Sequence, residues 1–211
     1  MLMKIVAING SPRSNSNTHH ALEKICGILS KSNDTEIIQV GDREIRGCMG
    51  CNACKKGADF CTFADDWFKE VTGKMYAADG IIIGSPVYYT GINGTLKSFL
   101  DRAFFQSNGR MRHKVGAALA ICRRSGGMTT FEQINAYFTI SEMLIATSLY
   151  WNIGHGMKPG EVTKDLEAQS IFEQLALNMD WLLKMKDITK DTLPKPEPVD
   201  RAWMNFVRDD K

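Results

Sequence analysis

Short apolar segments alternate with amphipathic segments along most of this chain of 211 residues, and this alternation constrains the fold more than any other feature. Lys4–Asn9, with its run Ile-Val-Ala-Ile, is typical of a buried strand. Thr18–Leu29 places apolar residues along one stripe, as an amphipathic helix does. Strands that alternate with helices form a parallel sheet with helices on both faces. We therefore expect an α/β protein.

The pattern predicts five strands and five helices. The predicted strands are Lys4–Asn9, Thr35–Val40, Gly80–Ser85, Val115–Cys122 and Leu144–Thr147. The predicted helices are Thr18–Leu29, a segment from Asp65 or Asp66 to Ala78, Thr95–Phe105, Thr130–Ser141 and Asp165–Met185. The length suits one domain with elaborations. We expect that domain over residues 1–190, with a cysteine-rich loop at 47–62, and a proline-containing arm over 191–211. Trp203 and Phe206 suggest that the arm docks on something, such as another subunit.

Four of the six cysteines, Cys48, Cys51, Cys54 and Cys61, fall within 14 residues as C-x2-C-x2-C-x6-C. Three thiolates at this spacing, with a fourth nearby, match what a [4Fe–4S] cluster requires of one loop. Structural zinc more often uses two separated C-x2-C pairs, so a zinc site is a weaker interpretation. A third interpretation is that the thiols are redox-active, or that the loop simply packs without binding a metal.

Ligands of parallel sheets bind beyond the carboxyl ends of the strands, so the loops there are informative. The first predicted strand is followed by a loop rich in hydroxyls and amides, just before a helix N-terminus. Its candidate ligand-binding residues are Ser11, Arg13, Ser14, Ser16, Asn17 and Thr18. Free N–H groups at that terminus and a guanidinium suit a terminal phosphate. The loop is neither G-x-G-x-x-G nor a P-loop, which disfavours dinucleotides, ATP and GTP.

Two further loops follow the third and fourth predicted strands. The first offers the flat faces of tyrosines and a backbone that a ligand can approach closely, and both suit a planar heterocycle. Its candidate residues are Pro86, Val87, Tyr88, Tyr89, Thr90 and Gly91. The second offers Arg123, Arg124, Gly126 and Gly127, which can close over the pyrimidine side of such a ring or admit an anionic substrate. Cys122 is expected to be a small buried residue near the ring.

The sequence resembles the NADPH-dependent FMN reductase-like flavoproteins of the flavodoxin-like fold. Gly10-Ser-Pro-Arg13 with Asn17-Thr18 is similar to their FMN phosphate loop. Gly84-Ser-Pro-Val-Tyr-Tyr89, followed by Leu96-Lys97 and Phe99-Leu-Asp-Arg102, is similar to their isoalloxazine loop and the helix after it. The cysteine run is similar to that of the iron–sulfur flavoprotein branch of this family.

The resemblance implies a flavodoxin-like three-layer sandwich with a five-stranded parallel sheet in the order 2-1-3-4-5. It also implies one FMN per subunit, a homodimer or tetramer, and a cluster that exchanges electrons with the flavin. NAD(P)H is a candidate cosubstrate, and a ferredoxin-like protein a candidate electron donor. The electron acceptor would be a small molecule.

Other classes of function have less support. A formal charge of +2 is too small to argue for nucleic acid or anionic lipid as a partner, and the longest apolar run, about Val115–Cys122, is far short of a bilayer span. Without a signal peptide pattern we expect a cytoplasmic protein. No nucleophile or acid–base motif appears. His19 and His20 are expected to be exposed, and His155 to lie in a solvent loop or at the flavin edge.

Three hypotheses follow. The first is an FMN-dependent electron-transfer oxidoreductase with a [4Fe–4S] cluster. The second is an NAD(P)H-dependent flavin, quinone or nitro-compound reductase in which no cluster functions. The third is a zinc-binding or sensing module without flavin.

Overall fold

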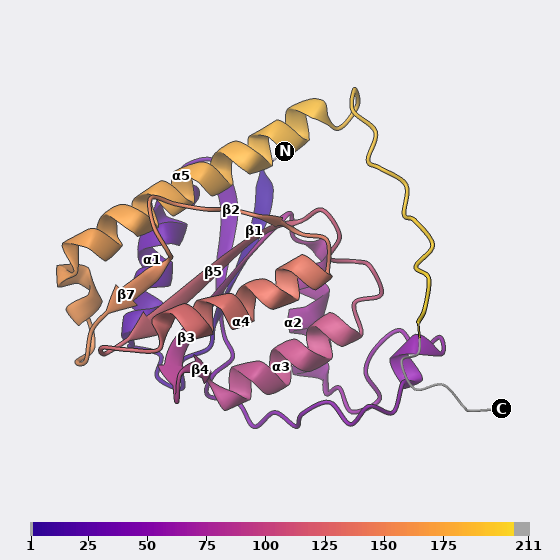
Figure 1. Ribbon diagram of the computed structural model, residues 1–211, viewed down its shortest axis with the longest axis horizontal. Coiled ribbons are helices and arrows are strands. Elements are labelled where there is room, and N and C mark those ends of the chain that lie inside the picture. Colours follow the sequence, from indigo (N-terminus) through magenta and orange to yellow (C-terminus); the bar gives the residue numbers. More distant parts are fainter. Residues whose placement is uncertain (1, 205–211) are drawn as a thin grey trace.

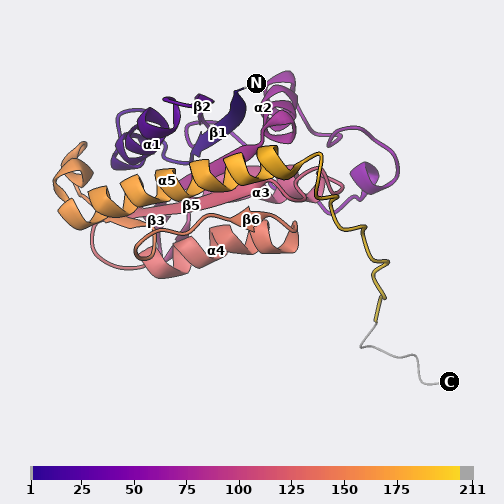
Figure 2. The same ribbon diagram turned by 90° about the horizontal axis from the view of Figure 1, so that it is seen from above.

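The computed structural model describes residues 2–204, in which helices cover both faces of a central sheet (Figures 1 and 2). The strands are β1 (Met3–Asn9), β2 (Asn33–Gln39), β3 (Gly80–Tyr88), β4 (Gly91–Ile92), β5 (Val115–Cys122), β6 (Leu144–Ile145) and β7 (Ile153–His155). The helices are α1 (Asn17–Leu29), α2 (Asp66–Ala77), α3 (Gly94–Phe105), α4 (Gly127–Ile140) and α5 (Leu166–Thr189), with 3-10 turns η1 (Ala53–Lys55) and η2 (Glu161–Lys164). The main sheet runs β2-β1-β3-β5-β6 with parallel neighbours, which confirms the flavodoxin-like order.

Alternate side chains of the central strands face opposite layers, as strand geometry requires. Ile5 and Ala7 of β1 join the core formed with α1 and α5. Val6 and Ile8 of the same strand join the core formed with α2, α3 and α4. Because both faces are covered, β1 and β5 are continuous apolar runs, and this is why they were recognisable in the sequence.

The expected count of five strands is wrong, because residues 2–204 contain seven. The fifth position of the sheet is divided between β6, which pairs with the start of β5, and β7, which pairs with its end. Between them the chain leaves the sheet in a turn, where Ser148 Oγ donates to Tyr150 O at 2.7 Å and lies 2.6 Å from Asn152 Oδ1. β7 contains Gly154 and lacks an apolar run, so it gave no strand signal. β4 adds a two-residue antiparallel hairpin to β3.

Helix boundaries depend on caps that periodicity does not show. α4 begins at Gly127, three residues before the predicted start, because Gly126 caps it with a φ of +88°. α5 continues to Thr189, beyond the predicted Met185. Residues 191–204 contain no helix or strand (Figure 1). Trp203 is 84% exposed, and with Arg201 it borders a hollow beside α3 and α4. Phe206 lies outside the described residues.

Within residues 2–204, no helix combines the length and the apolar character that crossing a membrane would require.

Candidate functional site

An open groove with about 610 Å³ of empty space lies at the carboxyl ends of β1, β3 and β5. We call it the strand-end groove. It is lined by Ser11, Pro12, Arg13, Asn15, Ser16, Asn17, Thr18, Pro86, Val87, Tyr88, Ile121, Cys122, Arg123, Gly156, Met157 and Pro159.

The loop after β1 is held in place by main-chain and amide hydrogen bonds. Gly10 N donates to Gly84 O at 2.8 Å, which ties the loop to β3. Gln39, at the end of β2, donates from Nε2 to Ser11 O at 2.5 Å and accepts from Asn9 Nδ2 at 2.6 Å. A Cβ at Gly41 would lie 2.1 Å from Gly10 O, so the loop also needs a glycine beside it. The loop is therefore shaped before any ligand binds.

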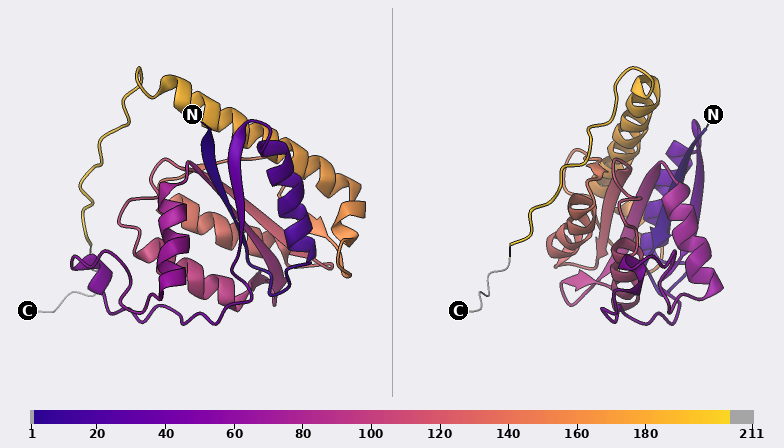
Figure 3. Two further views of the ribbon diagram at one scale, coloured as in Figure 1. Left: turned by 180° about the vertical axis from the view of Figure 1, so that it is seen from behind. Right: turned by 90° about the vertical axis from the view of Figure 1, so that its right-hand side faces the viewer.

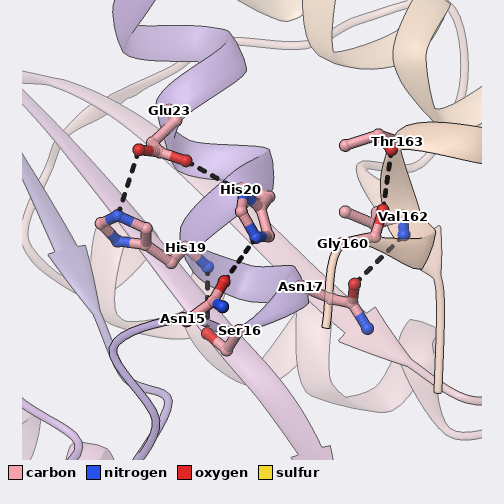
Figure 4. A network of polar contacts seen from close by, with 9 residues as sticks. All are labelled: Asn15, Ser16, Asn17, His19, His20, Glu23, Gly160, Val162 and Thr163. Atoms are coloured by element: carbon pink, nitrogen blue, oxygen red, sulfur yellow. Dashed lines mark hydrogen bonds and ion pairs between the residues drawn. The ribbon is translucent and has the colours of Figure 1, made fainter. Parts of the chain in front are cut away.

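The start of α1 is fixed by side chains of the same segment (Figure 4). Ser16 Oγ caps the helix by accepting from His19 N at 3.2 Å. Asn17 reaches across to the chain before α5: its Nδ2 donates to Lys158 O at 2.9 Å, and its Oδ1 accepts from Val162 N at 3.1 Å. The amide of Asn17 thus holds the far wall of the groove against α1, a structural role that the sequence did not reveal.

The two histidines of α1 are half-buried rather than exposed, which corrects the expectation for them. His20 lies 2.7 Å from Asn15 Oδ1 and 3.0 Å from Glu23 Oε2, and His19 lies 3.3 Å from Glu23 Oε1 (Figure 4). These contacts place the pair beside the groove, where His20 orders the side chain of Asn15.

Nine of the sixteen predicted cofactor residues line the strand-end groove. They are Ser11, Arg13, Ser16, Asn17, Thr18, Pro86, Val87, Tyr88 and Arg123. The other seven, Ser14, Tyr89, Thr90, Gly91, Arg124, Gly126 and Gly127, lie outside its lining. The lining also includes the buried Cys122, and burial raises the pKa of its thiol.

The tip of the β3–β4 hairpin explains why some of the predicted residues line the groove and others do not. Tyr88 pairs with Gly91, and Tyr89 and Thr90 form the turn between them with φ values of 46° and 60°. In this turn Tyr89 is fully exposed, and only Tyr88 contributes an aromatic face to the groove. The turn still adjoins the groove wall, because a Cβ at Gly126 would lie 2.9 Å from both Thr90 Cα and Val87 Cγ1.

A second hollow lies on the other side of Cys122, and we call it the Trp151 hollow. Three predicted residues line it: Arg124, Gly126 and Gly127. His155 also lies here, in β7, with Nδ1 3.0 Å from Asp165 Oδ2. Sequence reasoning did not find the Tyr150–Trp151 wall of this hollow, because it belongs to the turn that interrupts the edge strand.

The electrostatics of the strand-end groove favour an anion. Its lining includes the guanidinium groups of Arg13 and Arg123 and the N-terminus of α1, and no acidic side chain. A phosphate dianion fits this donor set, and Pro86, Val87 and Tyr88 offer an apolar surface for a planar ring. Residues of the groove that sequence reasoning missed, Gly156, Met157 and Pro159, come from the chain after β7.

The cysteine-rich segment forms a separate pocket, which we call the cysteine pocket. Figure 3 shows residues 41–65 leaving β2 and running along the edge of the molecule past α3 before α2 begins. All four predicted ligands, Cys48, Cys51, Cys54 and Cys61, line the pocket, and all are free thiols. However, no three His, Cys, Asp or Glu side chains within residues 2–204 form a group that could hold a metal ion.

One thiol of the pocket, that of Cys51, has a lowered pKa. A hydrogen bond from the Ala53 backbone lowers the pKa of Cys51, and the Thr62 hydroxyl, 3.9 Å from its sulfur, acts in the same direction. Metal binding requires the thiolate, so this loop favours the form that a metal would bind.

Side chains from α3 and the turn after it hold the cysteine loop from outside. Arg102 donates from Nη1 to Arg46 O at 3.3 Å and from Nη2 to Phe63 O at 2.8 Å, which joins the two ends of the loop. Gln106 Oε1 accepts from Cys61 N at 2.6 Å, and Asn108 Nδ2 donates to Cys54 O at 2.9 Å. The residues that shape the pocket therefore lie about 40 to 55 positions after the cysteines, and only the cysteines themselves gave a sequence signal.

Comparison with known proteins agrees with this arrangement. The family model of NADPH-dependent FMN reductases matches residues 3–158. An iron–sulfur flavoprotein of Methanocaldococcus jannaschii is 39% identical over 172 residues, which are 77% of this chain and 88% of that protein. An iron–sulfur flavoprotein of Archaeoglobus fulgidus is 36% identical over 154 residues, which are 71% of this chain and 75% of that protein.

Among solved structures, RosB with a bound 8-demethyl-8-formylriboflavin-5'-phosphate superposes with a TM-score of 0.69. The match covers 97% of this chain and 92% of RosB at 15% identity, so it shows a shared fold. The sequence matches establish the family as well as the fold. The chain belongs to the NADPH-dependent FMN reductase family, in its iron–sulfur flavoprotein branch, and is an FMN-dependent oxidoreductase.

Proposed function

We propose that FMN binds in the strand-end groove with its phosphate against the loop from Ser11 to Thr18. Arg13 and the N–H groups at the start of α1 would hold the phosphate, because this end of the groove combines cations with free donors and carries no acid. Ser16 and Asn17 would act mainly by fixing the loop and the far wall, since their side chains already have backbone partners. Ser14 and Thr18 would add hydroxyl contacts.

The ring of FMN would lie against Pro86, Val87 and Tyr88, with Arg123 near its polar edge. We propose that the residues outside the lining form the outer rim. They are Tyr89, Thr90, Gly91, Arg124, Gly126 and Gly127. The contact between the hairpin tip and the Gly126 turn supports this, because it makes the two segments one wall beside Val87.

The cysteine pocket would hold a [4Fe–4S] cluster on Cys48, Cys51, Cys54 and Cys61. Their common pocket, their free thiols and the lowered pKa of Cys51 support this assignment. When bound, FMN exchanges electrons in pairs or singly and a cluster exchanges them singly, so the two groups connect two-electron with one-electron partners. The task of this chain is to bind, orient and tune them.

The electron donor would be a ferredoxin-like protein or NAD(P)H, and the acceptor a small molecule. A homodimer or tetramer in the cytoplasm would be the working form, with the arm at 191–211 docked on a neighbouring subunit. The exposed Trp203 supports a docking role for the arm.

A second function has one observation in its favour. The four thiols do not form a metal-holding group, and Cys48 and Cys51 are exposed. An NAD(P)H-dependent FMN, quinone or nitro-compound reductase without a working cluster would agree with that.

Purification without oxygen decides between them. We expect a flavin spectrum with a broad cluster absorbance, and about four iron atoms and four sulfides per chain. Flavin without iron or sulfide, with fast NADPH oxidation that survives the change of all four cysteines to serine, would establish the second function. Protein without flavin would refute both.

A further inference from the structure

Arg102 is a buried cation, only 5% exposed, in the third turn of α3. Its guanidinium lies 4.1 Å from the centre of the Phe68 ring, and its terminal nitrogens donate to the carbonyls of Arg46 and Phe63. Among residues 2–204, no carboxylate pairs with it within 4.0 Å, and its Nε is buried without a hydrogen-bond partner. Asp65 borders the hollow outside it, but Asp65 Oδ1 accepts from Phe68 N as the cap of α2. A buried charge without an anionic partner is costly, so a partner is expected.

Gln106 follows one helical turn later on the same face of α3. Its Oε1 accepts from Cys61 N, and its buried Nε2 makes no hydrogen bond of good geometry within the described residues, although the Gln106 amide lies close enough to the Tyr76 hydroxyl to act on the pKa of that group. Buried donors in native proteins are rarely left unpaired. Two such donors, from Arg102 and Gln106, thus occur on one face of one helix, and both residues line the cysteine pocket.

We propose that Arg102 is the buried counter-cation of the cluster and that Arg102 and Gln106 donate N–H hydrogen bonds to its sulfurs. This inference rests on the cluster assigned under the proposed function. A centre held by four thiolates is anionic and supplies the charge that Arg102 lacks. Hydrogen bonds to the sulfurs and nearby charge set the reduction potential of such clusters. Through these direct contacts, both side chains would govern cluster retention and potential.

The other cations around the loop do not satisfy this requirement. Arg46 lies over the Phe63 ring at 4.7 Å, and Lys55 lies over the Phe105 ring at 4.7 Å with its Nζ 2.8 Å from Asn108 Oδ1. Both residues are exposed, so solvent and salt screen their charges. The buried guanidinium is screened least and acts most strongly on the pocket.

The test compares Arg102→Met, Arg102→Lys and Gln106→Leu with wild type after cluster reconstitution without oxygen. Arg112→Met is the control, because Arg112 is paired with Glu142 outside the pocket. Iron and sulfide are counted, iron loss to a chelator is timed, and the cluster potential is titrated by electron paramagnetic resonance. Denaturant unfolding is measured with and without iron.

We expect Arg102→Met to lose iron at least about tenfold faster, as outer-shell changes at metal sites do. Its remaining clusters would have a lower potential, because a cation favours the reduced, more negative state. Arg102→Lys keeps the charge and would lie between Arg102→Met and wild type. Gln106→Leu would shift the potential in the same direction by less, and Arg112→Met would behave as wild type.

A purely structural clamp gives a different result. It would destabilise the iron-free and iron-loaded proteins equally and leave the potential unchanged, and this outcome in both Arg102→Met and Gln106→Leu overturns the inference. Wild-type protein that takes up no iron overturns the cluster itself. The two failures are therefore distinguishable, and Gln106→Leu gives an answer even if Arg102→Met does not fold.

Discussion

The strand-end groove and the cysteine pocket are built in different ways. The groove is made where three buried strands end, and its first loop is fixed by bonds from Gly10 and Gln39. The pocket is made by a loop whose shape depends on α3: Arg102 reaches Arg46 O and Phe63 O, 56 and 39 residues away in the chain. The groove is thus a property of the sheet, and the pocket a property of one helix packed against a loop.

The difference shows how each site relates to its ligand. The groove has its donors in place, whereas the four thiols of the pocket share a cavity without forming a metal-holding group. Metal binding commonly supplies part of the folding free energy of such a loop. If the proposed function is correct, FMN would bind a site that is already formed, whereas a cluster would complete the site that holds it.

The largest expected effect separates the two sites completely. Changing Cys48, Cys51, Cys54 and Cys61 to serine should abolish iron binding and leave FMN affinity unchanged, because none of the four lines the groove. Iron analysis and flavin titration check this. Cys26→Ala is the control: burial raises the pKa of the Cys26 thiol to about 12, and iron should stay at the wild-type level. Loss of flavin in the serine variant would show that the sites are coupled.

The second effect concerns Arg13, one of the two arginines that line the groove. Arg13→Ala should weaken FMN binding by about 10- to 100-fold, since a charge-assisted hydrogen bond contributes about 1.5–3 kcal/mol. Fluorescence titration measures the dissociation constant, with Arg112→Ala as a control for loss of a surface cation. Iron content should be unaffected. If FMN affinity is unchanged, the phosphate of FMN does not bind at this loop.

A smaller effect tests whether the hydrogen bonds of Gln39 give the loop after β1 its shape. Gln39→Ala removes two hydrogen bonds to the loop and should cost about 1 kcal/mol in the free energy of unfolding, with FMN binding weakened about fivefold. Urea denaturation and flavin titration check the two quantities. If stability falls and FMN affinity does not, the loop holds its shape without Gln39.

The smallest effect is a pH dependence at the start of α5, where Asp165 lines the Trp151 hollow beside the groove. Burial alone would raise the pKa of Asp165, but hydrogen bonds from the Ala168 and His155 backbones and the His155 ring outweigh it and lower the pKa below 3.8. Its contribution is therefore present above pH 3.8 and is lost as the pH falls through the lowered value. Asp165→Ala should cost about 1 kcal/mol at pH 7, as loss of a helix cap does, and progressively less in acid. A cost that does not depend on pH would rule out the carboxylate as its source.

Sequence reasoning succeeded where the chain carries its signal locally. Buried strands such as β1 and β5 are continuous apolar runs, and the hydroxyl-rich loop after β1 stands beside a helix start, so the fold and the part of the groove formed by this loop were predictable. It failed where geometry depends on contacts distant in the chain. The hairpin turn leaves Tyr89 exposed, and the turn at Ser148 divides the edge strand. Neither event has a periodic signature.

The sequence by itself determined the alternation of strands and helices and the spacing of the thiols and of Arg13, because hydrophobic period and residue chemistry act over a few neighbouring residues. The order of the strands was expected only from the family resemblance. Only the tertiary structure decided that Arg102 is buried behind the cysteine loop with no carboxylate partner among residues 2–204, and that Asn17 holds the far wall of the groove. A buried charge or a shared amide becomes significant only when distant segments enclose it and water no longer solvates it.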